Sequence, residues 1–284
     1  MTTSRPRRAA VLGHPVAHSL SPVLHRSAYA ALGLDGWTYG TEDVTAEELP
    51  AFVAAMDESW CGLSLTMPLK HAVMPLLDSI DPLAEVVGAV NTLLPVANVR
   101  VGANTDVHGI VSALGEGLDG RTARSVTVLG AGATAASTLA ALGELGCTTP
   151  SVLVRSLART GDLRAAATRM GVSPTFDRLD RAVELMQSSD IVISTLPGAA
   201  ADGIAAELGG ASGPHTPAID GLLLDVVYEP RPTALSAAWA RRGGATVAGE
   251  RMLLHQAAEQ VRLMTGHAAP LAAMDAALSS ALAA

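Results

Sequence analysis

Short apolar runs alternate with amphipathic stretches along this chain, a pattern typical of strands and helices that follow one another in turn. Before residue 105, the apolar runs predict strands at 9–13, 37–44, 61–66, 89–94 and 99–104, the last two as a hairpin. Helices are predicted over 19–32, over 81–88, and after Thr45, where Glu48 three residues on gives a capping-box pattern.

The pattern changes near Asp106. From there the predicted strands are 125–129, 151–154, 190–194 and 221–227, and the predicted helices are 134–145, 159–170, 233–241, 249–265 and the residues from Pro270 onward. A loop is predicted over 209–217. Regular alternation of this kind is typical of a parallel sheet with helices packed on it. The pattern therefore predicts an α/β protein whose organisation changes near Asp106.

Composition supports this class and argues against two kinds of partner. Hydrophobic residues make up 49% of the chain and aromatic residues only 3%, so the cores consist of Ala, Val and Leu, which suits helices packed on sheets. The net charge of -8 argues against nucleic acid, and no apolar run approaches the ~20 residues of a membrane span. Cys61 and Cys147 match neither a disulfide framework nor a metal site, which predicts a cytoplasmic protein.

A glycine-rich turn at residues 130–135 follows an apolar strand and precedes a predicted helix. Its sequence, Gly-Ala-Gly-Ala-Thr-Ala, matches the dinucleotide-binding pattern in the strand–turn–helix context that the pattern requires. Gly130 permits the tight turn, Gly132 lets the backbone approach a pyrophosphate, and Ala135 keeps helix and strand close. The candidate cofactor-binding residues of this turn are Gly130, Ala131, Gly132 and Ala133.

The end of the next predicted strand, residues 151–154, indicates which nicotinamide cofactor binds. An Asp or Glu there would bind the ribose hydroxyls of NAD, and the chain has neither. It has Arg155, Ser156 and Arg159 instead, and two guanidinium groups with a hydroxyl between them can bind the 2′-phosphate of NADP. The alternative is a pair of solvated surface arginines. The sequence favours NADP.

Lys70 is the only lysine among 19 lysine and arginine residues. Arginine stays charged at any workable pH, whereas a partly buried lysine can give up its proton. Lys70 follows a Thr-x-Pro turn that begins at Thr66, so it is a candidate proton donor. A surface lysine without function is the alternative.

Several motifs occur in a characteristic order along the chain. They are His18-Ser19-Leu20-Ser21-Pro22-Val23-Leu24-His25, Thr66-Met67-Pro68-Leu69-Lys70, Gly88-Ala89-Val90-Asn91-Thr92, Asn104-Thr105-Asp106, the glycine turn and Gln256-Ala257. Together they resemble the shikimate and quinate dehydrogenase family over residues 9–266. The resemblance implies NADPH-dependent reduction of 3-dehydroshikimate to shikimate, a step in aromatic amino acid biosynthesis.

The resemblance also implies a fold in two parts. An α/β substrate-binding domain would cover residues 1–105 and be completed by the C-terminal helices at 249–284. A Rossmann-type, doubly wound nucleotide-binding domain would cover residues 106–248.

Site residues are carried over from the family position by position. The resemblance makes Lys70 and Asp106 the catalytic pair, with Lys70 as proton donor and Asp106 orienting it. It implies substrate binding by Ser19, Ser21, Thr66, Asn91, Tyr228 and Gln256, in which the two serines bind a carboxylate. On the cofactor side it adds Val226, Gly249 and Met252, and it requires no metal.

Several of these residues could have a purely structural role instead. Ser21 could cap the helix that follows it, Asp106 could cap the next one, and Asn91 could form a turn. The chain also departs from the family pattern with Ser64 and Val154 where Asn is frequent, and Arg251 has no evident role. A quinate-preferring enzyme with NAD and a non-catalytic nucleotide sensor are the rival functions. The sequence does not decide whether the chain forms a homodimer.

Overall fold

The computed structural model describes residues 6–210 and 218–283. The chain divides into two compact units, Met1–Gly109 with Leu253–Ala284, and Ile110–Met252. It passes from one unit to the other within α5 (Asp106–Leu118) and again within α11 (Gly249–Thr265). Among the described residues, no helix is long and apolar enough to cross a membrane.

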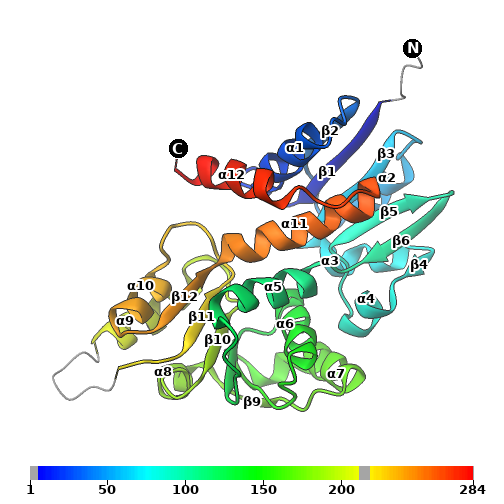
Figure 1. Ribbon diagram of the computed structural model, residues 1–284. Helices are drawn as coiled ribbons and strands as arrows, with labels where there is room; N and C mark the ends of the chain where they lie inside the picture. The colour runs from blue at the N-terminus through cyan, green and yellow to red at the C-terminus, as the bar shows by residue number, and fades with distance from the viewer. Residues whose placement is uncertain (1–5, 211–217, 284) are drawn as a thin grey trace. The chain divides into compact units, whose positions relative to one another are not determined.

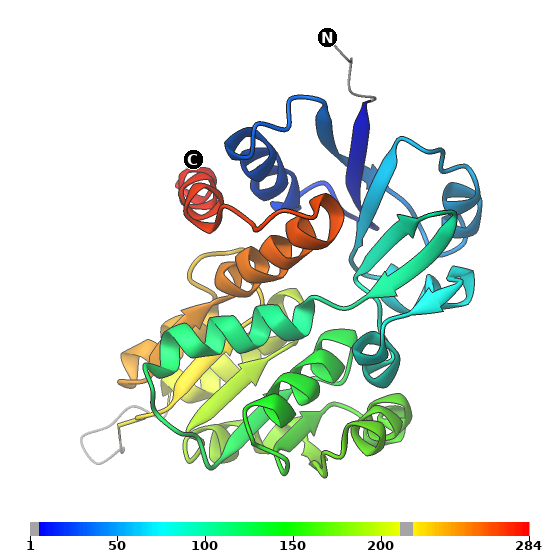
Figure 2. The same ribbon diagram turned by 45° about the vertical axis from the view of Figure 1, so that its right-hand side comes forward.

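The first unit contains a six-stranded mixed sheet in the order β2-β1-β3-β5-β6-β4. Its strands are β1 Arg7–Gly13, β2 Trp37–Asp43, β3 Trp60–Leu65, β4 Ser79–Ile80, β5 Thr92–Val96 and β6 Val99–Ala103. β1 runs parallel to β2 and β3, and β5 runs antiparallel to β3 and β6. Figure 1 and Figure 2 show the strands side by side, from β2 through β1 and β3 to the β5–β6 hairpin.

Alternation along β1 shows how this sheet builds two cores. Successive side chains of a strand point to opposite faces. Ala9 and Val11 accordingly pack with α1, α11 and α12, whereas Ala10 and Leu12 pack with α2, α3 and α4. These helices are α1 Ser21–Ala31, α2 Leu49–Ala54, α3 Leu69–Ala72, α4 Pro82–Val87 and α12 Leu271–Leu282, together with the short 3₁₀ turn η1 Met74–Leu76. α1, α11 and α12 lie on the same side of the sheet in Figure 1.

The second unit contains a six-stranded parallel sheet in the order β12-β11-β10-β7-β8-β9. Its strands are β7 Val126–Leu129, β8 Ser151–Val154, β9 Thr175–Arg178, β10 Ile191–Ser194, β11 Leu222–Asp225 and β12 Ala245–Ala248. The strand order reverses between β7 and β10, as in the doubly wound nucleotide-binding fold. The predicted α/β class with a Rossmann-type sheet is therefore confirmed.

Helices cover both faces of this second sheet. They are α6 Ala133–Glu144, α7 Gly161–Met170, α8 Ala182–Met186, α9 Asp202–Gly210 and α10 Ala234–Arg241, with 3₁₀ turns η2 Leu157–Arg159, η3 Leu179–Arg181 and η4 Gly198–Ala201. Leu129, Leu153 and Leu223 pack against α8, α9 and α10. Figure 1 shows α9 and α10 on one side of the sheet and α6 and α7 on the other.

Several predicted elements differ from the observed ones. β4, β9 and β12 are not predicted, because these edge strands are short or lack an apolar run. The short α8 and α9 are not predicted either. Gly209 and Gly210, expected in a loop, end α9, and residues 211–217 of that loop lie outside the described residues.

Three predicted helix starts are also wrong, the first being that of α1, which begins at Ser21 and not at Ser19. α2 begins at Leu49, and the N–H of Thr45 donates to the Glu48 carboxylate within a turn that precedes the helix. The capping pair is thus present, one turn earlier than the helix itself. Arg159 belongs to the 3₁₀ turn η2, and α7 begins only at Gly161.

Candidate active site

Lys70 lies on the short helix α3, which follows β3. Leu69 beside it is fully buried, and the Lys70 carbonyl accepts a hydrogen bond from the Val90 N–H, so the backbone is fixed on both sides. The Lys70 ammonium donates to Asp106 Oδ2 at 2.5 Å. Only 14% of the lysine side chain and 5% of the aspartate side chain are exposed. The structure therefore contradicts a freely solvated Lys70.

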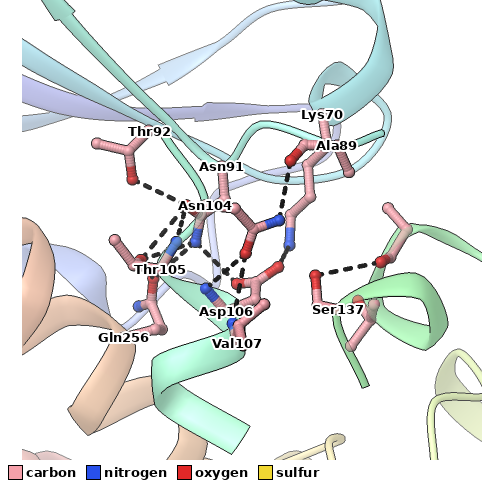
Figure 3. Close-up of polar contacts among 12 residues, drawn as sticks. Lys70, Ala89, Asn91, Thr92, Asn104, Thr105, Asp106, Val107, Ser137 and Gln256 are labelled. Carbon is pink, nitrogen blue, oxygen red and sulfur yellow. Dashed lines mark hydrogen bonds and ion pairs between the residues drawn. The ribbon is translucent and has the colours of Figure 1, made fainter. Parts of the chain in front are cut away.

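Asp106 is the first residue of α5, but it does not cap that helix. Asn104 does so, because its Oδ1 accepts from the backbone N–H groups of Asp106 and Val107. The Asp106 carboxylate thus remains available for side chains, and Figure 3 shows it between Lys70 and Asn91. Since the cap is supplied by Asn104, the capping alternative for Asp106 is wrong.

Asn91 joins this pair to two further polar residues. Its Nδ2 donates to Asp106 Oδ1 at 2.8 Å and to Thr105 Oγ1 at 2.9 Å. Its Oδ1 accepts from the Thr105 N–H and the Thr92 hydroxyl, each at 2.8 Å. Asn91 is 1% exposed. A buried amide with this many partners has a fixed orientation.

Gln256 reaches the same group from α11. Its Nε2 donates to the Leu253 carbonyl, while its Oε1 accepts from Asn91 and Thr105, each at 3.4 Å. These two bonds are at the long end of the hydrogen-bonding range. Four of the predicted residues are therefore brought together, namely Lys70, Asn91, Asp106 and Gln256 (Figure 3).

Ser19 and Ser21 lie at the start of α1. Ser21 is the first helical residue, and Leu20, which makes no side-chain cap bond, occupies the N-cap position. The capping alternative for Ser21 is therefore wrong. The Ser21 N–H donates to Ser19 Oγ at 3.3 Å, and the buried Ser21 hydroxyl interacts with that of Tyr39. No direct hydrogen bond among the described residues joins either serine to Lys70.

Thr66 lies directly after β3 and is half-buried. Its backbone N–H donates to the Leu12 carbonyl, and its carbonyl accepts from the Leu69 N–H. The threonine therefore fixes the turn that leads to Lys70. A contact between its side chain and a substrate stays a prediction.

The glycine turn connects β7 to α6 in the second unit. Gly130 has φ +110°, and a Cβ there would lie 2.5 Å from Thr195 Oγ1. A Cβ on Gly132 would meet no atom within 4 Å. The turn is therefore tight at Gly130 and open at Gly132, above the N-terminus of a helix that begins at Ala133. An open N-terminus of this kind suits a phosphate group.

Arg155, Ser156 and Arg159 follow β8, the strand beside β7. Both arginines are exposed, and neither forms an ion pair within the part of the chain that the structure describes. Val154 before them is buried and apolar. The exposed guanidinium groups remain available for an anion, and this arrangement fits a 2′-phosphate better than a ribose with free hydroxyls.

Val226, Gly249, Tyr228 and Met252 also belong to the second unit. A Cβ on Gly249 would lie 2.4 Å from the Val226 carbonyl oxygen, so only glycine fits where α11 approaches the end of β11. Beside them, burial raises the pKa of the Asp225 carboxyl, opposed by the hydrogen bonds that it accepts from Thr233 and the Val227 N–H. Tyr228 is half-buried and Met252 buried, and contacts of both with ligands stay predictions.

The structure also accounts for Arg251. Its guanidinium donates to both oxygens of Glu116 on α5, each at 2.7 Å.

Within the described ranges, no group of three or more His, Cys, Asp or Glu side chains could bind a metal ion.

Sequence reasoning misses Thr105, Gln260, His25 and Tyr39, which are all buried in the first unit. Thr105 lies within the Asn104-Thr105-Asp106 motif, but the sequence indicates a role only for its neighbour Asp106. Gln260 could have been noticed because it follows Gln256 by four residues and so shares its helix face. Burial lowers the pKa of His25 to about 3, so this side chain is neutral.

Two family models match the chain. Residues 11–93 match the shikimate dehydrogenase substrate binding domain, and residues 249–278 match the shikimate 5′-dehydrogenase C-terminal domain. The shikimate dehydrogenase (NADP(+)) of Citrifermentans bemidjiense is 37% identical over 289 residues, covering 99% of this chain and 97% of that protein. This chain belongs to the shikimate dehydrogenase family. The resemblance inferred from the motifs is thereby confirmed.

Solved structures of the family agree with the fold. The shikimate dehydrogenase of Mycobacterium tuberculosis is 40% identical, with a TM-score of 0.84, covering 97% of this chain and 100% of that one. The shikimate 5-dehydrogenase of Thermus thermophilus, solved in complex with NADP(H) and shikimate, is 32% identical, with a TM-score of 0.80. The match covers 97% of this chain and 100% of that one. Similarity over the whole length means that both units belong to the family fold.

Proposed function

We propose that this protein is an NADP-dependent shikimate dehydrogenase, which reversibly reduces 3-dehydroshikimate to shikimate. Full-length relatives that carry this name support the proposal. The observation that carries it is the mostly buried Lys70–Asp106 pair with Asn91 bonded to the aspartate. A surface ion pair without function would not require three polar groups in such a poorly solvated position.

In this proposal Lys70 transfers one proton, and Asp106 orients Lys70. Bound NADPH supplies the hydride for the carbonyl carbon. The Lys70 ammonium stabilises the negative charge that develops on the carbonyl oxygen and donates a proton to it, and it takes the proton back in the oxidative direction. Asp106 orients the ammonium through Oδ2, while Asn91 holds Oδ1.

The substrate's polar groups match side chains of the first unit. Asn91, Thr66 and Gln256 bind the ring hydroxyls in this proposal, and Ser19 and Ser21 bind the carboxylate. The two 3.4 Å bonds to Gln256 Oε1 support its role, because weak bonds of that length are readily exchanged for shorter ones to a hydroxyl. Tyr228 is assigned to the substrate on the resemblance alone.

The second unit holds the cofactor in this proposal. The open space at Gly132 and the N-terminus of α6 suit the pyrophosphate. Ala131 and Ala133 flank that glycine, and Arg155, Ser156 and Arg159 bind the 2′-phosphate. Val226, Gly249 and Met252 bind the nicotinamide end.

One assay tests the proposal. The purified chain is mixed with shikimate or quinate and with NADP⁺ or NAD⁺, and the absorbance at 340 nm is followed. We expect the fastest rise with shikimate and NADP⁺. A faster rise with quinate and NAD⁺ would favour the quinate enzyme. No rise with any pair, from a chain that still binds NADP⁺, would favour a sensor.

The same proposal includes a cytoplasmic location and a homodimer. Both cysteines are free thiols, which suits a reducing compartment. Light scattering across a range of protein concentrations tests the dimer.

A further inference from the structure

Gln260 lies on α11, one helical turn beyond Gln256, and is only 1% exposed. Its Oε1 accepts from the Ser64 hydroxyl at 2.7 Å and contacts His25 Nε2 at 3.3 Å. Its Nε2 donates to the Asn91 carbonyl at 3.2 Å and to Thr92 Oγ1 at 2.9 Å. An amide offers two acceptor and two donor positions. All four are used.

The orientation of this amide is determined by its partners. The Asn91 carbonyl can only accept, so the Gln260 NH₂ group must face it, and Oε1 must face Ser64 and His25. His25 therefore donates through Nε2 as a neutral imidazole, which agrees with a pKa lowered to about 3 by burial. The His25 ring also stacks on Tyr39 with centroids 4.0 Å apart. The group is rigid because no member can rotate without losing a bond.

From Gln260, hydrogen bonds lead to Lys70. The Gln260 NH₂ donates to Thr92, the Thr92 hydroxyl donates to Asn91 Oδ1, and Asn91 Nδ2 donates to Asp106, the partner of Lys70. Each group donates to the next, so no proton is required twice. The backbone contact with the Asn91 carbonyl adds a second attachment to the same residue.

In the other direction, hydrogen bonds lead from Gln260 through Ser64 to Tyr39, whose hydroxyl lies near the Ser21 side chain. Ser64 donates to Gln260, the Tyr39 hydroxyl donates to Ser64 at 2.6 Å, and the Tyr39 hydroxyl also interacts with that of Ser21. Gln260 thus connects the serine proposed for the carboxylate with the residues proposed for the ring hydroxyl and the carbonyl.

A purely apolar core would be the simpler way to fill this space. Buried polar groups reduce stability unless every one is hydrogen-bonded, and replacement by apolar residues is often neutral or stabilising. Within this network, both ends reach residues of the proposed substrate site, and the links between them are side-chain contacts from α11, β2, β3 and β5. An arrangement of this kind sets the distance between two groups that bind one rigid molecule.

We propose that Gln260 is a positioning residue of the substrate site, which fixes the spacing between Ser21 and the Asn91–Asp106–Lys70 group. This inference rests on the proposed function. Gln260 touches neither substrate nor cofactor in this proposal, and it acts through Ser64 and Tyr39 on one side and through Asn91 on the other.

Gln260→Met is the main test, because methionine matches the shape of glutamine and removes all four bonds. A misplacement of about 1 Å can cost ~10²-fold in rate, so we expect kcat/KM for shikimate to fall about 10- to 100-fold. The KM for shikimate should rise while the KM for NADP⁺ stays unchanged. A merely structural role would lower only the folded fraction, with both KM values kept.

The matched control is Met274→Ala in α12. Met274 is fully buried in the same unit and makes no bond to the network, so the variant loses packing alone. It should be less stable to heat yet keep both KM values. Comparison with Gln260→Met separates positioning from stability.

Ser64→Ala provides the second variant if Gln260→Met does not fold. It removes one donor to Gln260 and leaves the amide bonded to Asn91 and Thr92, so the KM for shikimate should rise by a smaller factor. Unchanged KM for shikimate in the folded variants would overturn the inference. A wild-type chain without activity on shikimate would instead overturn the proposed function.

Discussion

The two regions proposed to bind ligands are built in opposite ways. In the first unit, buried side chains bond to one another, and Asn91, Thr105, Asp106 and Gln260 are each at most 3% exposed. In the second unit, the glycine turn offers backbone N–H groups and open space, and the two arginines beside it are exposed. The first region depends on side chains being present, and the second depends on a side chain being absent at Gly132.

This difference determines which substitutions matter. Removing one member of a buried network leaves its partners unsatisfied, which costs about 1–3 kcal/mol per group. Adding a methyl group at Gly132, where it would meet no protein atom within 4 Å, should block the ligand without disturbing the fold. Deletions should therefore be most damaging in the first unit, and additions should be selectively damaging at the glycine turn.

Lys70→Ala should have the largest effect. General acid–base catalysis typically contributes ~10²–10⁴-fold, so we expect kcat to fall by about that factor while the KM for NADP⁺ is unchanged. Steady-state kinetics in both reaction directions measure the effect. A variant that retains most of the wild-type kcat would exclude Lys70 as the proton donor.

Replacing both Arg155 and Arg159 by Leu should come next. Hydrogen bonds to charged groups contribute about 1.5–3 kcal/mol each. The KM for NADP⁺ should therefore rise at least tenfold, whereas the KM for NAD⁺ should change little. Arg124→Leu is the control, because Arg124 is an exposed arginine just before β7, at the end opposite the glycine turn. Equal losses with NADP⁺ and NAD⁺ would contradict the 2′-phosphate assignment.

Gly132→Ala and Gly130→Ala form a matched pair on the glycine turn. At Gly132 the added methyl group meets no protein atom within 4 Å, so the melting temperature should be unchanged while the KM for NADP⁺ rises. At Gly130 the methyl group would lie 2.5 Å from Thr195 Oγ1 at φ +110°, so stability should fall as well, by about 1–2 kcal/mol for the backbone alone. Calorimetry and kinetics on both variants test the contrast. A destabilised Gly132→Ala chain would refute the open-space interpretation.

The same difference explains what the sequence could predict. The glycine turn follows from local backbone rules, so Gly130, Gly132 and the parallel sheet around them are foreseeable from a short segment. The edge strands β4, β9 and β12 are not, because they are short or lack an apolar run.

In the first unit, the proposed catalytic pairing of Lys70 with Asp106 was foreseeable only through motifs in a known order. The hydrogen bond between Gln260 and Ser64 joins residues 196 positions apart in the chain. The cap of α5 by Asn104 is local, but the sequence alone does not show whether Asn104 or Asp106 supplies it. Apart from the four-residue spacing of Gln256 and Gln260, the buried network leaves no periodic signal, because its other members lie on different elements of the chain. Such contacts need the folded structure.

His25→Gln should have the smallest effect, and it tests whether the buried network carries a pH dependence that the backbone site lacks. Burial lowers the pKa of His25 from 6.5 to about 3. Between these values the unfolded chain binds a proton that the folded chain does not, so the free energy of unfolding falls as the pH drops below 6.5, at most by about 1.4 kcal/mol per pH unit. Above pH 6.5 this contribution to stability is fully present.

Glutamine at position 25 can still donate toward Gln260 but does not titrate. Its free energy of unfolding should therefore depend less steeply on pH than that of the wild type, which urea titrations at pH 7, 6 and 5 would measure. Gly132→Ala, which alters only the backbone site, should keep the wild-type slope and serves as the control. If His25→Gln and the wild type lose stability at the same rate, His25 is not the group that couples the first unit to pH.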